Sequence, residues 1–68
     1  MHTINLREDY IKLGQALKAA GLVNSGVEAK IVILEGEVKV NGNVETQRGK
    51  KLFSGDIVSY NGEEIKIS

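Results

Sequence analysis

The residues with the clearest chemical potential lie in one short basic stretch, TQRGKKL, at positions 46–52. Arg48, Lys50 and Lys51 surround Gly49 there, although the whole chain balances nine Lys and Arg against nine Asp and Glu. Three cations around a glycine can bind an anion such as a phosphate, because glycine lets backbone amides approach closely. They can equally form a solvated turn, and the remaining sequence has to separate these two interpretations.

The chain has few side chains that could catalyse a reaction or bind a metal ion. His2 is the only histidine, and there is no cysteine, so neither a zinc site nor a catalytic triad can be assembled. We expect the His2 side chain to be frayed and without a role. A phosphate loop is also excluded around Gly49-Lys50, since Val44 replaces its first glycine and Lys51 its Ser or Thr. The sequence therefore predicts a protein that is not an enzyme, with no cofactor, metal or small-molecule substrate.

Aromatic residues are equally sparse. Tyr10, Phe53 and Tyr60 are the only ones, and all three occupy positions that core packing would use. A sheet that stacks unpaired bases needs exposed rings. We therefore do not expect a single-strand-binding module.

A first helix is predicted over residues 10–20, where apolar residues recur at helical spacing: Tyr10, Leu13, Leu17 and Ala20. Gly21 follows at a position where helices commonly end. Gly14 lies inside this helix, where glycine costs about 1 kcal/mol relative to alanine. We expect close packing at Gly14 as the reason for its presence.

A second helix is predicted over residues 24–36, beginning with a capping box. Ser25 would accept a hydrogen bond from the amide of Glu28, whose carboxylate would accept one from the amide of Ser25. Val27, Ile31 and Leu34 would line one face of this helix, and Gly36 would end it. Residues 31–33 could also form a strand, but the cap and the closing glycine favour a helix. The short joint between the helices predicts that they pack as a close hairpin.

Strand patterns follow Gly36. For the Asn41-Gly42 turn we prefer a three-residue loop, Asn41–Asn43, because it pairs Val40 with Val44 and keeps apolar residues on one face. A two-residue turn at Asn61-Gly62 instead pairs the strands without adjustment, placing Val58 opposite Ile65 and Tyr60 opposite Glu63. The opening HTINL could add an edge strand, and Asp56 would close a turn.

These elements predict an α+β fold in which a two-helix hairpin packs on a small, mostly antiparallel β-sheet. We expect a single domain over residues 1–68, because 68 residues make one domain at most. A chain of this length buries only about 60% of its unfolded surface, so its core is small. No run of 18 apolar residues is present, so no membrane association is expected. Residues 1–10 are too polar for a signal peptide, and we expect a cytoplasmic monomer.

Residues 21–42, GLVNSGVEAKIVILEGEVKVNG, resemble the alpha-L RNA-binding motif of the ribosomal protein S-four type. The shared frame consists of Gly21-Leu22, Ser25, Ala29, Gly36, Val38, Val40, Asn41 and Gly42, followed by Gly55-Asp56-Ile57-Val58. With the first helix, the resemblance extends over about residues 10–60. The short format, with ETQRGKKL after the hairpin, is similar to free-standing bacterial members that carry no catalytic domain.

The resemblance implies that the partner is structured RNA of the ribosomal or transfer RNA class, and it leaves ribosome association open. Family members often have an arginine directly after the helix-capping serine, where this chain has Gly26. The RNA contacts would then shift to Lys30 and the 46–51 turn. The second helix start also offers free amides to a phosphate. The candidate RNA-binding residues are Ser25, Lys30, Lys39, Thr46, Gln47, Arg48, Lys50 and Lys51.

A small protein–protein interaction module without RNA binding is the alternative. Asp56, Glu63 and Glu64 outnumber Lys66 in the last hairpin, and this acidic surface could dock on a partner. A ubiquitin-like sulfur carrier is disfavoured, because the chain ends in EIKIS rather than in a flexible Gly-Gly.

Overall fold

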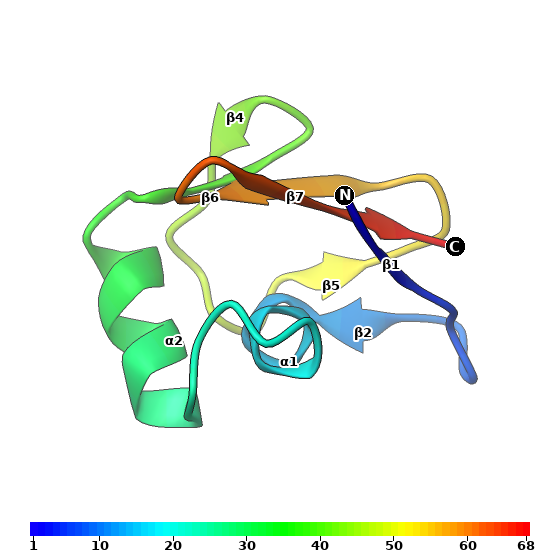
Figure 1. The fold of residues 1–68 in the computed structure, drawn as a ribbon, viewed down its shortest axis with the longest axis horizontal. Helices are drawn as coiled ribbons and strands as arrows, with labels where there is room; N and C mark the ends of the chain where they lie inside the picture. The colour runs from blue at the N-terminus through cyan, green and yellow to red at the C-terminus, as the bar shows by residue number, and fades with distance from the viewer.

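The computed structural model describes residues 1–68, and it places two helices against one face of a five-stranded sheet (Figure 1). The elements in chain order are β1 (His2–Ile4), β2 (Ile11–Lys12), α1 (Leu13–Ala19), α2 (Gly26–Leu34), β3 (Val38–Val40), β4 (Asn43–Val44), β5 (Lys51–Leu52), β6 (Ile57–Tyr60) and β7 (Glu63–Ile67). The predicted α+β class, with two consecutive helices on a mostly antiparallel sheet, is confirmed. Neither helix is long and apolar enough to cross a bilayer.

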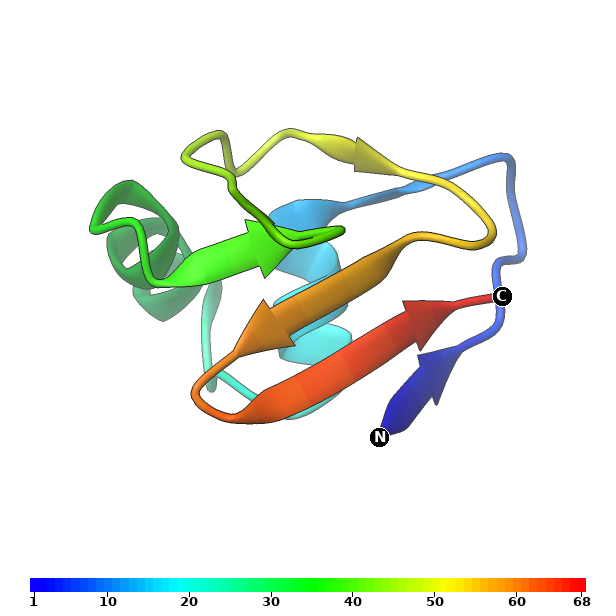
Figure 2. The ribbon, with the colours of Figure 1, turned by 90° about the horizontal axis from the view of Figure 1, so that it is seen from above.

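The large sheet has the strand order β1-β7-β6-β3-β4, and Figure 2 shows α1 behind it. The last hairpin has the predicted register, with Val58 opposite Ile65 and Tyr60 opposite Glu63. Its turn residues Asn61 and Gly62 both have positive φ, at 53° and 77°, as a two-residue turn of this kind requires.

The N-terminal segment HTINL forms the expected edge strand, β1, which runs parallel to β7. His2 is consequently held in the sheet, and its Nε2 lies 3.0 Å from Glu63 Oε1. The expectation of a frayed, unengaged histidine was therefore wrong. Strand pairing and this contact both tie the N-terminus to the last hairpin.

The register at the Asn41-Gly42 turn differs from the sequence prediction. Val40 pairs with Asn43 and Lys39 with Val44, so the loop has two residues rather than three. The preference for pairing Val40 with Val44 assumed that Val44 must be buried. Strand β4 lies at the sheet edge and leaves Val44 55% exposed. The positive φ angles of Asn41 and Gly42, 51° and 84°, set the register instead.

Helix α1 begins three residues later than predicted. Residues Ile11 and Lys12 form β2, which pairs with β5 in a separate two-stranded sheet. Tyr10 therefore lies outside the helix, and its side chain is 37% exposed. The helix ends as expected, because Gly21 adopts a φ of 75° and its amide donates to Lys18 O.

Helix α2 is capped by Ser25, whose Oγ accepts a hydrogen bond from the Glu28 amide at 3.1 Å. The reciprocal bond differs from the prediction, because Glu28 Oε1 accepts from the amide of Asn24 at 2.8 Å. At the other end, Gly36 has a φ of 77° and the Glu37 amide donates to Val32 O. Residues 31–33 are therefore helical, as the two end signals predicted.

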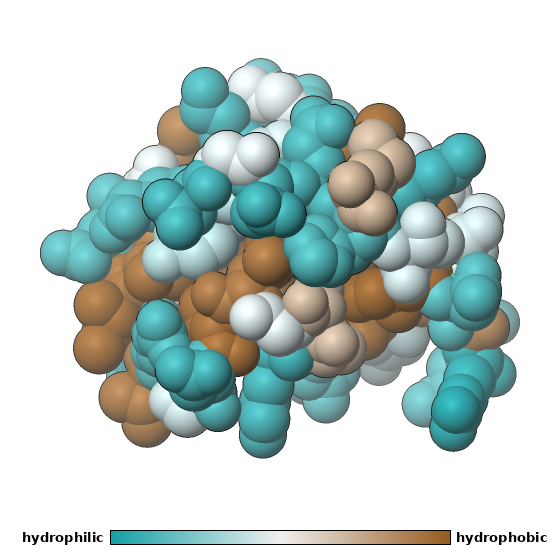
Figure 3. Space-filling view, viewed as in Figure 1, coloured by the Kyte–Doolittle hydropathy of each residue, from teal (hydrophilic) through white to brown (hydrophobic).

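The apolar stripe predicted on one face of α2 is not the face that packs on the core. Ala29, Val32 and Ile33 are buried, whereas the stripe formed by Val27, Ile31 and Leu34 is 69%, 51% and 60% exposed. Apolar residues occur almost all around this helix, so periodicity does not decide which side packs. Figure 3 shows the exposed stripe as hydrophobic surface over α2, at the left of the view.

The core lies between the helices and the inner face of the large sheet. It contains thirteen buried apolar residues, among them Leu13 and Leu17 of α1, Ile33 of α2, and Val38 and Ile65 of the sheet. The alternating exposure of β3 fits this arrangement, because Val38 and Val40 are buried while Lys39 is exposed on the outer face. No buried side-chain nitrogen or oxygen lacks a hydrogen-bond partner.

Removal of the α2 cap gives a direct test of this local structure. Ser25→Ala should lower the free energy of unfolding by about 1 kcal/mol, because the Glu28 amide loses its acceptor. Ser54→Ala is the matched control, since Ser54 is exposed and its hydroxyl makes no hydrogen bond. Chemical denaturation of both variants measures the effect, and equal midpoints for the two variants would contradict the cap.

Candidate nucleic-acid interface

The basic stretch 46–51 is bound to the start of α1 through its backbone. The Lys50 amide donates to Gln47 O at 3.2 Å, which closes a turn. Two carbonyls of this turn then accept from α1, with Leu13 N donating to Lys50 O at 2.8 Å and Gly14 N to Arg48 O at 3.1 Å. The first amides of a helix have no partner within the helix. The turn supplies those partners and is thereby held at a defined position.

Gly14 leaves room for the Arg48 side chain to pack against the start of α1. A Cβ atom at this position would lie 2.6 Å from Arg48 Cγ and 3.2 Å from Arg48 Cδ. Its φ is not positive, so steric space rather than backbone conformation requires glycine here. The close packing expected at Gly14 is confirmed, and the residue packed against it is Arg48.

A polar cavity of about 380 Å³ opens where α1, the turn and the start of α2 meet. Its lining contains no hydrophobic residue, and we call it the cationic cavity: Lys12, Gly14, Gln15, Lys18, Gly26, Arg48 and Gly49. Three cationic side chains from two separate parts of the chain therefore converge at one place. Such convergence is a suitable arrangement for binding an anion.

The cations of this region are available to an external partner. The single ion pair in the structure joins His2 to Glu63, so none of the nine Lys and Arg side chains is neutralised by a carboxylate at contact distance. Glu28 is the only acidic residue in the first turn of α2, and it does not line the cationic cavity. No group of three or more His, Cys, Asp or Glu could hold a metal ion.

The predicted site residues of the turn lie in different surroundings. Arg48 lines the cationic cavity, whereas Lys50 and Lys51 line a separate depression of about 350 Å³ together with Glu45 and Asp56. Thr46 and Gln47 are exposed and line neither. The turn therefore presents cations in two directions around one backbone loop.

The remaining predicted residues lie on α2 and β3. Ser25 is half-buried at the helix cap, next to Gly26 of the cationic cavity. Lys30 follows Gly26 by four residues and is exposed on the same side of α2. Lys39 lies on the outer face of the sheet, away from the helices, so the structure does not bring it together with the cationic cavity.

Three residues of the cationic cavity were not among the predicted site residues: Lys12, Gln15 and Lys18. Lys12 is the residue directly before α1, and Gln15 and Lys18 follow it at intervals of three, which places the three residues on one side, opposite the buried Leu13 and Leu17. The same periodicity that indicated the apolar stripe would have indicated this polar one. Their convergence with Arg48 could not be read from the sequence, because it depends on the contact between the turn and α1.

Two aromatic rings are more exposed than predicted. Tyr10 is 37% and Phe53 50% exposed, and only Tyr60 packs against the core. The Tyr10 and Phe53 ring centroids are 6.2 Å apart, and Lys51 Nζ lies 4.7 Å from the Tyr10 centroid. The expectation that all three aromatics belong to the core was wrong: Tyr10 precedes β2 instead of lying in the helix, and Phe53 directly follows β5 with its side chain half exposed. The structure therefore has an exposed aromatic pair beside the basic turn.

Asn41 and Asp56 have structural roles that explain the motif residues around them. Asn41 donates to Asp56 Oδ1 at 3.0 Å and accepts from the Ile57 amide at 2.9 Å. Asp56 Oδ2 accepts from the Phe53 amide at 2.8 Å, which closes the turn predicted at Asp56. These bonds join two turns that lie 15 residues apart in the sequence.

Together, the helix pair, the mostly antiparallel sheet and the turn-to-turn hydrogen bonds define a small alpha-L type domain. Residues 4–68 match the family model described as S4 domain, and the chain belongs to that family. The solution structure of YbcJ from Escherichia coli, described as having an alfaL motif involved in RNA-binding, superimposes with a TM-score of 0.75 at 40% identity. That similarity covers 98% of this chain and 86% of the YbcJ chain.

Two curated relatives support this assignment. One is "Putative RNA-binding protein YbcJ" of Escherichia coli (strain K12), 40% identical over 98% of this chain and 97% of its own length. The other is "Probable ribosome maturation protein RlbA" of Bacillus subtilis (strain 168), 42% identical over 87% of this chain and 83% of its own length.

The role of Gly14 can be tested by comparing two glycines of the cationic cavity. Alanine at an exposed helical glycine normally stabilises by about 1 kcal/mol. Gly14→Ala should lack this gain and should destabilise by about 1 kcal/mol, because the overlap with Arg48 Cγ displaces the Arg48 side chain from its contact with α1. Gly49→Ala is the control, since a Cβ atom at Gly49 would have no neighbour within 4 Å and the φ of this residue is not positive.

The measurements are thermal unfolding and amide hydrogen exchange at Leu13 and Gly14 or its replacement. Faster exchange at both amides in Gly14→Ala alone would indicate that the turn carbonyls have moved away. A Gly14→Ala protein that is more stable than wild type, with unchanged exchange, would show that the turn does not depend on this glycine.

Proposed function

We propose that this protein is a non-catalytic RNA-binding protein that docks on structured RNA through the phosphates of its backbone. The proposed binding face consists of the cationic cavity, Lys30 on α2 and the Lys50-Lys51 side of the turn. One observation carries the proposal: Lys12, Lys18 and Arg48 converge on a cavity that no hydrophobic residue and no carboxylate lines, and none of the three forms an ion pair. The names of the relatives YbcJ and RlbA support RNA as the class of partner.

Double-helical RNA suits this surface better than a long single strand. Its phosphates and 2′-hydroxyls are accessible across a wide minor groove, and proteins recognise it largely through these groups. Such contacts need local clusters of cations rather than a high total charge, which agrees with the net charge of zero. We propose RNA of the ribosomal class first, because of the ribosome maturation in the name of RlbA, and transfer RNA second.

Arg48 offers a substitute for the arginine that family members often carry at the position of Gly26. Gly26 and Arg48 line the same cavity, although they are 22 positions apart in the chain. The absence of a side chain at Gly26 leaves the α2 amides accessible from the side where Arg48 lies. A phosphate in this cavity would thus meet cationic side chains and the partial positive charge of the α2 start.

A protein-docking function is the second candidate, and the exposed stripe of Val27, Ile31 and Leu34 favours it. Exposed apolar residues that gather on one helix face are typical of interaction surfaces. The acidic hairpin is a weaker candidate for docking, because Glu63 already contacts His2. If docking were the main function, Ile31→Gln with Leu34→Gln would abolish it and leave RNA affinity unchanged.

The salt dependence of RNA binding tests the proposed face. Lys18→Gln with Arg48→Gln removes two charges from the cationic cavity, and Lys39→Gln with Lys66→Gln removes two from the outer face of the sheet. Each phosphate contact contributes roughly −0.9 to the slope of log affinity against log salt. The cavity variant should therefore flatten the slope by about 2 and weaken binding of all RNA sequences alike. The outer-face variant should keep the wild-type slope.

The measurement is a salt titration of each protein against the same folded RNA hairpin, with circular dichroism to establish that all are equally folded. Because both variants change the net charge equally, long-range effects cancel in the comparison. A flatter slope for the outer-face variant alone would indicate that RNA binds to the face that carries Lys39 instead. Equal and unchanged slopes for both variants would contradict phosphate binding by either face.

A further inference from the structure

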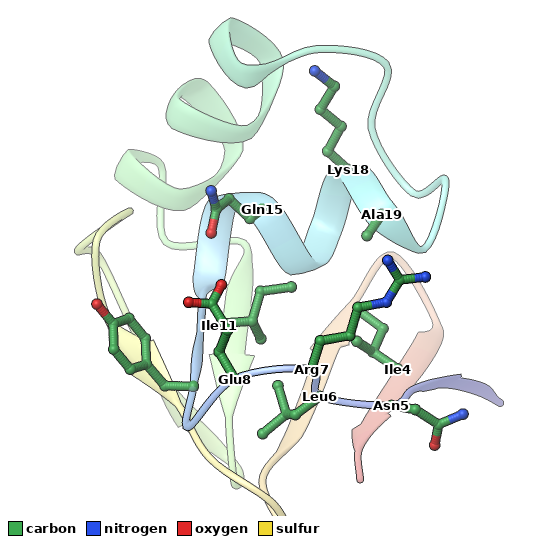
Figure 4. Close-up of a pocket in the computed structure, with 10 residues that line it drawn as sticks. Ile4, Asn5, Leu6, Arg7, Glu8, Ile11, Gln15, Lys18 and Ala19 are labelled. Atoms are coloured by element: carbon green, nitrogen blue, oxygen red, sulfur yellow. The ribbon is translucent and has the colours of Figure 1, made fainter.

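A second cavity, of about 570 Å³, lies between the N-terminal segment and α1. Its apolar walls are formed by Ile4, Leu6, Tyr10, Ile11 and Ala19, and we call it the apolar cavity. Figure 4 shows Ala19 on α1 pointing toward the segment that carries Leu6, Arg7 and Glu8, whereas Lys18 extends from the other side of the helix toward α2. The volume falls within the range of pockets that hold small organic groups, roughly 300–1,000 Å³.

The apolar cavity adjoins the cationic cavity. Gln15 and Lys18 line both of them, so one side of α1 forms a wall that they share. The resulting groove has a section with apolar walls and a section lined only by polar residues and glycine. An occupant that matches both sections must combine a flat or apolar group with an anion at a short distance.

We infer that this groove holds a single unpaired nucleotide of the bound RNA, with its phosphate in the cationic cavity and its base in the apolar cavity. The inference rests on the proposed RNA-binding function and extends it from phosphate docking to recognition of one base. A nucleotide has the required composition, since an anionic phosphate adjoins an aromatic base with apolar faces and a polar edge. Unpaired bases are also the usual targets of specific RNA recognition.

Half of the lining of the apolar cavity is polar or charged: Asn5, Arg7, Glu8, Gln15 and Lys18. Asn5 and Gln15 are the two amides among these residues, and an amide side chain can donate to and accept from a base edge at once. Asn5 makes no side-chain hydrogen bond in the structure, and the contact that Gln15 accepts from the Lys12 amide is long, at 3.4 Å. Their hydrogen-bonding capacity is therefore largely free for a ligand.

Tyr10 provides an aromatic surface for the base. Phe53 and Lys51 contact its ring, with the centroid separations of 6.2 Å and 4.7 Å, but neither of them lines the apolar cavity. Both neighbours thus support the ring from outside the cavity and limit its freedom before the RNA binds. A ring that is already restrained loses less entropy when a base stacks on it.

The test compares a fully paired RNA hairpin with hairpins of the same stem that contain one unpaired nucleotide, using each of the four bases in turn. Wild-type protein should bind at least one of the hairpins with an unpaired base about tenfold more tightly, as expected for one base stacked on an aromatic ring. Replacing the preferred base by fluorescent 2-aminopurine should give a change in emission on binding, because the base becomes stacked.

Ala19→Phe fills the apolar cavity from an exposed position of α1 and should abolish the preference, with unchanged affinity and salt slope for the paired hairpin. Val27→Phe is the matched control on α2, 69% exposed and outside both cavities, and should retain the preference. Should Ala19→Phe fail to fold, Tyr10→Ala replaces it. Tyr10→Ala should reduce the preference for the hairpin with an unpaired base several-fold, whereas Tyr10→Phe should retain that preference.

The outcomes separate the two levels of inference. Equal, salt-dependent affinity of wild type for all five hairpins would overturn the nucleotide site and leave phosphate docking intact. A preference that survives Ala19→Phe, or Tyr10→Ala where that variant replaces it, would also overturn the site. Absence of salt-dependent binding to any hairpin would overturn the proposed function, and the nucleotide site with it.

Discussion

The contact between the start of α1 and the turn that follows β4 determines where every candidate binding residue lies. Helix α1 begins without a side-chain cap, and its first amides donate instead to Lys50 O and Arg48 O. These two hydrogen bonds, together with the pairing of β2 with β5, attach the turn to the helix. Gly14 leaves room for the Arg48 side chain at this contact. Without this contact, Arg48 would be a mobile cation on a loop, and no cavity would exist between the helix and the turn.

The hydrophobic core and the two turns at one end of the sheet hold this arrangement in place. Leu52, which directly follows the basic residues, is fully buried and anchors β5 to the core. Asn41 and Asp56 then connect the turns on either side of that segment through side-chain hydrogen bonds. The basic turn therefore projects between two fixed points. Its backbone is constrained, while its cationic side chains remain exposed to a partner.

A neutral chain can still present a cationic surface, because folding separates its charges in space. Lys12, Lys18 and Arg48 gather at one cavity, whereas Glu63 and Glu64 lie on the last hairpin with His2 beside them. Coulomb interactions between exposed groups are screened within about 10 Å at ordinary salt. A phosphate at the cationic cavity thus experiences mainly the local charges. Composition alone could not reveal this separation.

Features that depend on neighbours within a few residues could be predicted from the amino-acid sequence. The Ser25 cap, the stops at Gly21 and Gly36, the turn at Asn61-Gly62 and the family frame were all predicted correctly, because each rests on local backbone chemistry. Other features depend on tertiary contacts. These are the buried face of α2, the position of Tyr10 outside the helix, the register of β4, and the convergence of Lys12 and Lys18 with Arg48. These outcomes depend on which surfaces come into contact over long separations in the chain, and hydrophobic periodicity carries no information about that choice.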